Sequence, residues 1–89
     1  MNCEEYDYIM TFTSHNRALY VFERLKWREI DAKLVTAPNK INISCTQAIK
    51  FKKADEDIVR LEVKLNNVYP TAVYKIINDG KTEEYELIE

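Results

Sequence analysis

Apolar and polar side chains alternate along several stretches of the chain, and this alternation is the pattern of half-buried β-strands. Residues 6–12 place large apolar or aromatic side chains at every second position, which suits one face of a pleated sheet. Three later stretches alternate in the same way or are rich in residues that favour strands. We therefore expect strands at residues 6–12, 30–35, 46–52 and 71–77.

Turn-forming residues separate these strands. Pro38 restricts its own φ and lacks a backbone N–H, so we expect it to end the second strand and to open a surface loop over residues 38–44. Asn78-Asp79-Gly80 is the strongest turn signal, and Gly80 is the only glycine, at a position that needs a positive φ. Residues 82–88 are therefore expected to fold back as a fifth strand.

Two other segments have the period of amphipathic helices. The first is predicted to run from His15 to Trp27, with Thr13 and Ser14 as candidate caps of its N terminus. The second is predicted to begin at the acidic residues 55–57, whose charge suits an electropositive helix N terminus, and to end at Asn66-Asn67. The expected buried positions are Ala18, Val21, Phe22 and Leu25 in the first helix and Ile58, Leu61 and Leu65 in the second.

The element order β-α-β-β-α-β, followed by one more strand, predicts a ferredoxin-like α+β sandwich with an added C-terminal hairpin strand. Residues 1–89 should form a single ferredoxin-like domain, with a core at about 6–77 and the extra strand at about 82–88. Both helices would cover one face of an antiparallel sheet. The other face would expose one parity of Tyr6, Tyr8, Met10 and Tyr74, and such an aromatic patch favours a homodimer.

Composition and charge exclude some classes of partner. The 13 basic and 15 acidic residues give a formal net charge of -2, so we expect no nucleic-acid partner. The chain has no apolar run of about 18 residues and its N terminus is acidic, so we expect no membrane association and no signal peptide. A cytoplasmic location is the resulting expectation, and Cys3 and Cys45 should then be free thiols.

Cys45 is the strongest candidate for chemistry because it lies where the loop after Pro38 meets the third strand. Nearby cations favour the reactive thiolate, and Lys40 and Lys50 lie five residues before and after it. The alternative is that Cys45 is buried as a small apolar side chain without reactivity. His15, the only histidine, is expected to be an exposed residue of the first helical turn, and the chain has too few ligands for a structural zinc site.

The residues around Cys45 also resemble those of a known family. The matching positions are Tyr8 to Phe12 with Ser14 and Ala18-Leu19, then Leu34 to Pro38, then Ile43-Ser44-Cys45 with Ala48, Lys50 and Phe51. Through these positions, over about residues 6–76, the chain is similar to small bacterial proteins described as putative selenium/sulfur carrier protein-like. The glycine that follows the cysteine in that family is Thr46 here, and its branched side chain makes close backbone approach to a bound group harder.

The resemblance implies a carrier in which Cys45 holds a sulfane sulfur or selenium atom as a persulfide or selenopersulfide. Ser44 and the amides near Thr46 would stabilise the adduct, while Lys40 and Lys50 would keep the thiol ionised. No metal or organic cofactor is implied, and a protein donor and a protein acceptor would be the partners of this carrier, which would not itself be an enzyme. The alternative is a non-catalytic binding or regulatory module that self-associates through its sheet, with a structural Cys45.

Overall fold

The strands and helices follow one another in the order predicted from the sequence. The structure is a computed structural model, and it describes residues 6–38, 40–41, 46–78 and 82–89. Its elements are β1 (Tyr8–Phe12), α1 (His15–Trp27), β2 (Lys33–Thr36), β3 (Gln47–Phe51), the short 3₁₀ helix η1 (Lys53–Asp55), α2 (Glu56–Asn66), β4 (Ala72–Asn78) and β5 (Glu83–Leu87).

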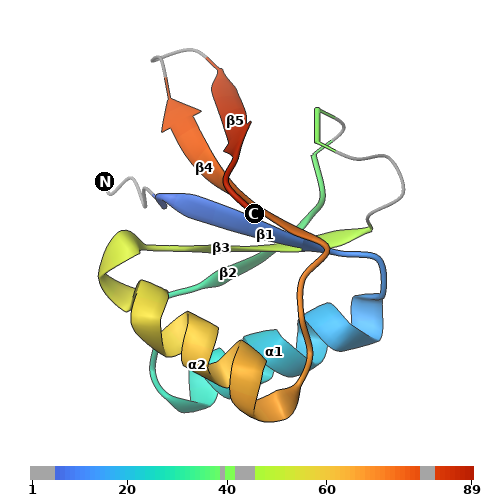
Figure 1. Ribbon diagram of the computed structural model, residues 1–89, viewed down its shortest axis with the longest axis vertical. Coiled ribbons are helices and arrows are strands. Elements are labelled where there is room, and N and C mark those ends of the chain that lie inside the picture. The colour runs from blue at the N-terminus through green and yellow to red at the C-terminus, as the bar shows by residue number, and fades with distance from the viewer. Residues whose placement is uncertain (1–5, 39, 42–45, 79–81) are drawn as a thin grey trace.

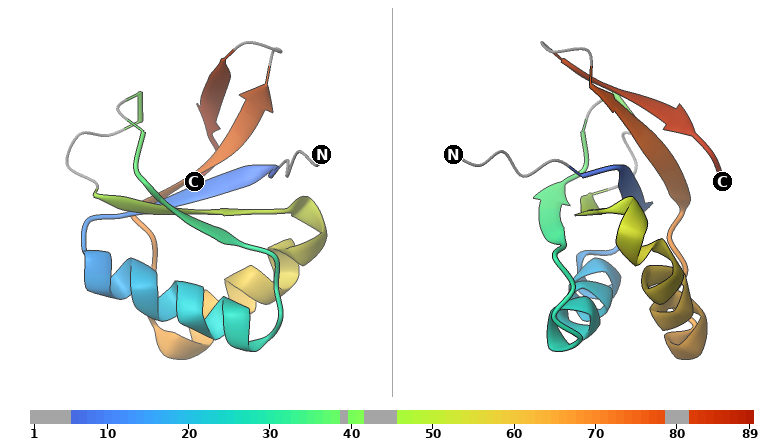
Figure 2. Two further views of the ribbon diagram at one scale, coloured as in Figure 1. Left: turned by 180° about the vertical axis from the view of Figure 1, so that it is seen from behind. Right: turned by 90° about the vertical axis from the view of Figure 1, so that its left-hand side faces the viewer.

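The strands form an antiparallel sheet in the order β2-β3-β1-β4-β5. β1 lies at its centre, with Met10 opposite Ile49 of β3 on one side and opposite Val73 of β4 on the other. Both helices lie on one side of the sheet, and the β4–β5 hairpin extends away from them (Figure 1, Figure 2). The architecture is the predicted α+β ferredoxin-like class with an additional strand at one edge.

The main core lies between the sheet and the two helices. Met10 and Phe12 of β1 are buried in it, together with apolar side chains of α1 and α2. The prediction that Tyr8 and Met10 lie on the uncovered face is wrong, because Tyr8 packs against this same core with its ring 5.4 Å from the ring of Phe51. The larger apolar side chains of β1 share this parity, and the helix-covered face removes the most apolar surface from water.

The face that the helices leave uncovered has a smaller cluster of its own. Ile9 and Ala48 are fully buried there. The partly buried side chains that pack against them are Val35, Ile41, Tyr74, Ile76 and Tyr85. Tyr74 therefore lies on this face, as predicted, whereas the Tyr6 hydroxyl donates a hydrogen bond to Asp31 Oδ1 at 3.0 Å. The single chain thus shields the centre of this face itself.

α1 has the predicted bounds, and a capping turn that was not predicted follows its C-terminal end. Glu29 has a left-handed φ of 63°, and the Ile30 N–H donates to the Leu25 carbonyl at 2.9 Å. This is a Schellman motif, in which the chain turns out of the helix while the apolar residue after the turn packs back onto it. Ile30 therefore belongs to the helix end, and β2 begins at Lys33 instead of residue 30.

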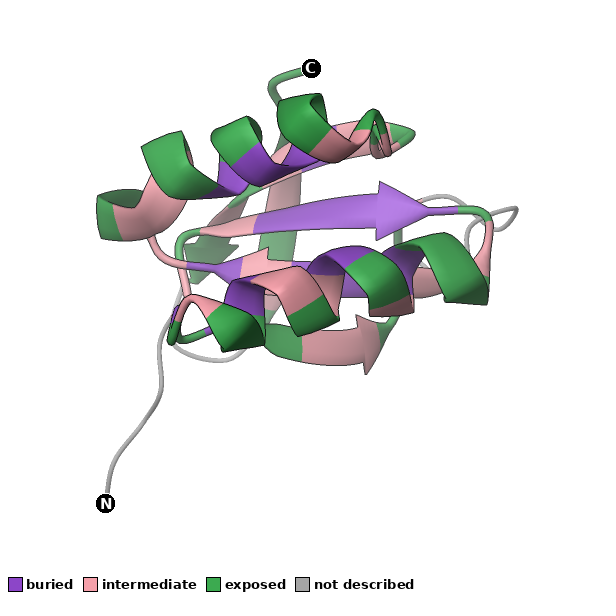
Figure 3. Cartoon of the chain, turned by 90° about the horizontal axis from the view of Figure 1, so that it is seen from below, coloured by how far each residue is buried: buried purple, intermediate pink, exposed green. Residues whose placement is uncertain are grey.

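α2 turns a different face to the sheet from the one predicted. Val59 and Val63 are buried, whereas the three residues expected to be buried are exposed: Ile58 at 36%, Leu61 at 43% and Leu65 at 66%. Figure 3 shows the buried strip of α2 turned inward and its exposed strip turned outward. The reason is Glu62, a carboxylate on the buried side whose charge is neutralised by Arg24 of α1 and by Arg28, the C-cap of that helix.

Glu62 and its neighbours link the two helices. One carboxylate oxygen lies 3.3 Å from Arg24 Nε, and the other pairs with Arg28 Nε. The Asn66 side-chain amide donates to the first oxygen at 2.8 Å, and the Tyr20 hydroxyl donates to Asn66 Oδ1 at 2.8 Å. Within the described ranges, no helix has the length and apolar character needed to cross a membrane.

Candidate functional site

Three residues of the predicted site or its chemistry lie outside the described residues. They are Cys45, its neighbour Ser44, and the second cysteine, Cys3. The predictions of a carrier thiol at Cys45 and of an adduct-binding role for Ser44 therefore remain predictions. The described residue next to Cys45 is Thr46, and its contacts establish where the chain that follows the thiol joins the sheet.

Thr46 is attached to the ends of two strands. Its N–H donates to the Phe12 carbonyl at 3.1 Å, and its Oγ1 donates to the Thr13 carbonyl at 3.2 Å. Its own carbonyl accepts from the Ala37 N–H at 3.3 Å. The Thr46 amide is bound to the Phe12 carbonyl, and these contacts position the start of β3. The expected stabilisation of an adduct by amides near Thr46 remains a prediction.

The carbonyl that Thr46 Oγ1 binds lies just before the N terminus of α1. Ser14 is the N-cap of that helix, as predicted, and its Oγ accepts from the Arg17 N–H at 3.4 Å. The first turn contains no acidic residue, so no side chain in it offsets the partial positive charge of the helix N terminus. His15 is exposed in this turn, as predicted. The start of β3 thus lies beside an electropositive helix end.

The two lysines predicted to activate the thiol bind carboxylates of β5. Lys50 Nζ lies 3.0 Å from one oxygen of Glu83, and its side chain is only 19% exposed. Lys50 is also four residues beyond Thr46, a distance of roughly 13 Å along an extended strand. Lys40 Nζ lies 3.0 Å from Glu84 Oε2, but this pair is half-exposed and therefore weak.

Glu83 is the centre of a small polar cluster on the uncovered face. The Tyr85 hydroxyl donates to Glu83 Oε1 at 2.9 Å. Burial and this carboxylate raise the pKa of Tyr85 to about 12. Burial opposes the ionisation of Glu83, but hydrogen bonds from Lys50 and Tyr85 outweigh it and hold the pKa of Glu83 below its usual value.

Neither the Glu83 cluster nor the contact of Thr46 with the start of α1 was predicted from the sequence. The sequence signal that could have indicated the Glu83 cluster was the opposite charge of the lysines in residues 40–53 and of the acidic pair Glu83-Glu84. The signal for the second was the Thr13-Ser14 cap, which follows the end of β1. Among the residues that the structure describes, no group of three or more His, Cys, Asp or Glu side chains could hold a metal ion.

Comparison with known proteins adds one finding to this geometry. Residues 7–75 match the model of a family described as putative Se/S carrier protein-like. The match includes β1, α1, β2, β3 and α2 and ends within β4. Searches of curated proteins and of solved structures found no match.

Proposed function

The chain belongs to the putative Se/S carrier protein-like family, and from this premise we propose that Cys45 carries a sulfane sulfur or selenium atom between two partner proteins. The Cys45 thiolate attacks the terminal sulfur of a donor persulfide, R–S–SH. A new S–S bond forms on Cys45 as the donor S–S bond breaks, and the donor leaves as its thiolate, R–S⁻. An acceptor thiolate then attacks the terminal sulfur, which restores the Cys45 thiolate and leaves the acceptor as a persulfide.

The position of Thr46 is the observation that supports a reactive thiol. Thr46 directly follows Cys45 and is tied to Phe12 and Thr13, immediately before the N terminus of α1. Helix N termini lower the pKa of nearby thiols because their free N–H groups favour the thiolate. In this proposal α1 supplies most of the positive potential, since the ammonium group of Lys50 is bound by Glu83.

Ser44 and Lys40 keep smaller proposed roles. Ser44 directly precedes Cys45, and its hydroxyl would donate a hydrogen bond to the charged persulfide. Lys40 Nζ is held by a half-exposed ion pair with Glu84 and by an exposed hydrogen bond to the Glu83 carbonyl at 3.1 Å, so its ammonium group can exchange a partner for an anionic adduct at low cost. The donor and the acceptor would be proteins that present thiols, and no metal or organic cofactor enters the transfer.

Intact-mass spectrometry tests the proposal. The Cys3→Ser protein is incubated with a cysteine persulfide donor, and we expect it to gain the mass of one sulfur atom, which dithiothreitol then removes. The Cys3→Ser protein that also carries Cys45→Ser is the control and should gain nothing. Absence of the adduct in the first protein would refute carriage on Cys45, and an equal gain in both would place the sulfur elsewhere.

The pH dependence of alkylation tests the role of α1. The Cys3→Ser protein should react with iodoacetamide with an apparent pKa below the usual thiol value of about 8.5. Asn16→Asp adds a carboxylate to the first turn of α1 and should raise this pKa by about half a unit. Lys26→Gln, the matched control, makes the same change in net charge at the other end of α1 and should not change it. A thiol that reacts only on unfolding would favour the alternative binding module.

A further inference from the structure

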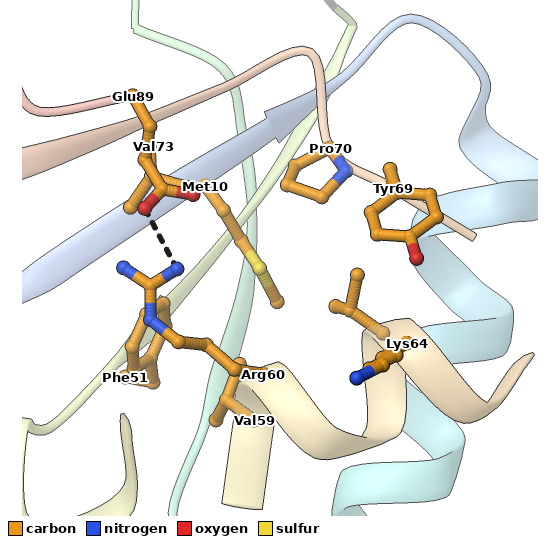
Figure 4. A pocket seen from close by; sticks show the side chains of 10 residues that line it. Met10, Phe51, Val59, Arg60, Lys64, Tyr69, Pro70, Val73 and Glu89 are labelled. Carbon is orange, nitrogen blue, oxygen red and sulfur yellow. Dashed lines mark ion pairs between the residues drawn. The ribbon is translucent and has the colours of Figure 1, made fainter. Parts of the chain in front are cut away.

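A pocket lies on the helix-facing side of the sheet. One of its lining residues is Phe51, so the pocket lies at the opposite end of β3 from Thr46. It has a volume of about 220 Å³ and lies between α2, the segment that leads into β4 and the last described residue (Figure 4). Met10 points into it from the central strand. Its apolar lining comprises Met10, Phe51, Val59, Val63, Pro70 and Val73.

Charged side chains of α2 lie at the edge of this apolar pocket. Arg60 Nη1 lies 2.7 Å from Glu89 Oε2, and Arg60 Nε lies 3.1 Å from Glu56 Oε2. Of these two carboxylates, only that of Glu89 belongs to a residue that lines the pocket. Lys64, the second cation of the lining, forms no ion pair with any described residue. The chain therefore already places one carboxylate of its own on the pocket's arginine.

We propose that this pocket binds a small carboxylate with an aromatic or branched apolar body, and that the ligand carboxylate replaces Glu89 on Arg60. An apolar cavity of roughly 150 Å³ takes up benzene, so 220 Å³ accommodates a ring with a short acid chain. The apolar walls bind the body, while Arg60 and Lys64 orient the carboxylate. Met10 is unbranched and adapts its shape to different bodies.

The Arg60–Glu89 pair is suited to such an exchange. The two side chains are 44% and 54% exposed, and exposed ion pairs contribute little to stability. A ligand that takes the place of Glu89 keeps the charge pairing of Arg60 and also fills the apolar pocket beneath it. Binding is then a competition between two carboxylates for one guanidinium group.

The test uses 3-phenylpropionate as the probe and 3-phenylpropionamide as its uncharged counterpart. The chain has two methionines, so protein labelled with ¹³C at the methionine methyl groups reports on the pocket through Met10, whose signal is assigned by its loss in Met10→Leu. We expect the Met10 signal to shift at millimolar or lower probe concentrations. The amide should bind about tenfold more weakly, since it lacks the charge-assisted hydrogen bond to Arg60.

Substitutions of two exposed residues, Glu89 and Arg60, distinguish competition for Arg60 from simple apolar binding. Glu89→Gln removes the competing carboxylate and should raise the affinity for 3-phenylpropionate several-fold without changing that for the amide. Arg60→Gln should remove the advantage of the acid over the amide. Cys45→Ser should leave binding unchanged, because the pocket lies at the Phe51 end of β3, whereas Cys45 precedes the other end of this strand in the sequence.

A Met10 signal that responds to neither probe would show that the pocket takes up no ligand of this class. Equal binding of acid and amide by the unmodified chain would show that Arg60 does not select a carboxylate. Weaker binding of the acid to Glu89→Gln would contradict the competition for Arg60.

Discussion

Glu62 is the residue whose role depends most on its tertiary surroundings. Its side chain is 1% exposed and accepts hydrogen bonds from Arg24, Arg28 and Asn66. Burial alone would raise the pKa of Glu62, but the hydrogen bonds from Arg28 and Arg24 outweigh burial, so the pKa lies below its ordinary value. The carboxylate is therefore ionised at neutral pH and joins α2 to α1.

We expect Glu62→Gln to lower the free energy of unfolding by about 1–3 kcal/mol, since it replaces charge-assisted hydrogen bonds at a buried position by weaker ones. Urea unfolding followed by circular dichroism measures the change. Glu56→Gln is the matched control on the same helix, because Glu56 also accepts from an arginine, Arg60, but at the surface. The control should cost about 0.5 kcal/mol or less. Equal losses would mean that the Glu62 network contributes no more than a surface pair.

The lowered pKa of Glu62 also makes stability depend on pH. Its folded-state pKa lies below the ordinary value of 4.5, so the unfolded chain takes up the proton first as the pH falls. The stabilisation from Glu62 is therefore present above about pH 4.5 and is lost as the pH falls through the folded-state pKa. Urea unfolding at a series of acidic pH values should show a steeper loss for the unmodified chain than for Glu62→Gln. Parallel curves for the two proteins would contradict this assignment.

At the scale of elements, the rotation of α2 about its axis decides which of its apolar residues form the core. The residues at 58, 61 and 65 repeat with helical spacing, and so do those at 59, 62, 63 and 66. The second set faces inward because its polar members, Glu62 and Asn66, find partners on α1. A helix with two candidate faces is thus oriented by the partners of its polar residues.

Matched truncations on α2 test this orientation. Val59→Ala should lower the free energy of unfolding by about 2 kcal/mol, because it leaves a cavity beneath the sheet. Leu61→Ala removes more atoms but from a side chain that is 43% exposed, and should cost less than about 1 kcal/mol. Thermal and urea unfolding report both values. A larger loss of unfolding free energy for Leu61→Ala than for Val59→Ala would indicate that the face predicted from the sequence pattern is the buried one.

At the scale of the whole molecule, β1 connects the two hydrophobic clusters. Met10 and Phe12 belong to the cluster beneath the helices, while Ile9 belongs to the cluster on the uncovered face. Thr11 is fully buried, and its hydroxyl lies 2.8 Å from that of Thr71. β1 pairs with strands on both sides, whereas β5 pairs with β4 at the edge of the sheet that the described residues form.

Hydrogen exchange should follow this arrangement. We expect the amides of Ile9, Met10 and Thr11 to exchange slowest, because β1 lies buried at the centre of the sheet and each amide opens only when the strand that it binds separates or the chain unfolds globally. The amides of β5 should exchange fastest among the strands, since β5 is an edge strand with mostly exposed side chains. NMR-detected exchange in D₂O measures these rates. Stronger protection in β5 than in β1 would contradict the described packing.

Self-association through the sheet remains a prediction at this scale. The patch expected to carry it included Tyr8 and Met10, which belong to the core beneath the helices. Tyr74 does lie on the uncovered face, but it packs beside Ile9 and Tyr85 in the same chain. An association through this face would therefore use the edges of the cluster and not an open aromatic surface.

The ends of elements that are set by residues adjacent in the sequence could be predicted from the sequence. The bounds of α1 follow from the Ser14 cap and the helical period after it. α2 ends at Asn66, and its C-cap is Asn67, whose φ of 55° is tolerated by asparagine. The position of Thr46 beside the start of α1 could not be predicted, because it depends on hydrogen bonds to Phe12 and Thr13, more than 30 residues away.

The sequence by itself determined the elements, the fold class and the resemblance to the family that residues 7–75 match, because strand alternation, helix caps and turns are local properties of the chain. Only the tertiary structure decided which face each element buries and which charges meet. Glu62 is 38 residues from Arg24, and Lys50 is 33 residues from Glu83. Such pairs form only after folding has brought distant elements together, and no local pattern in the sequence encodes them.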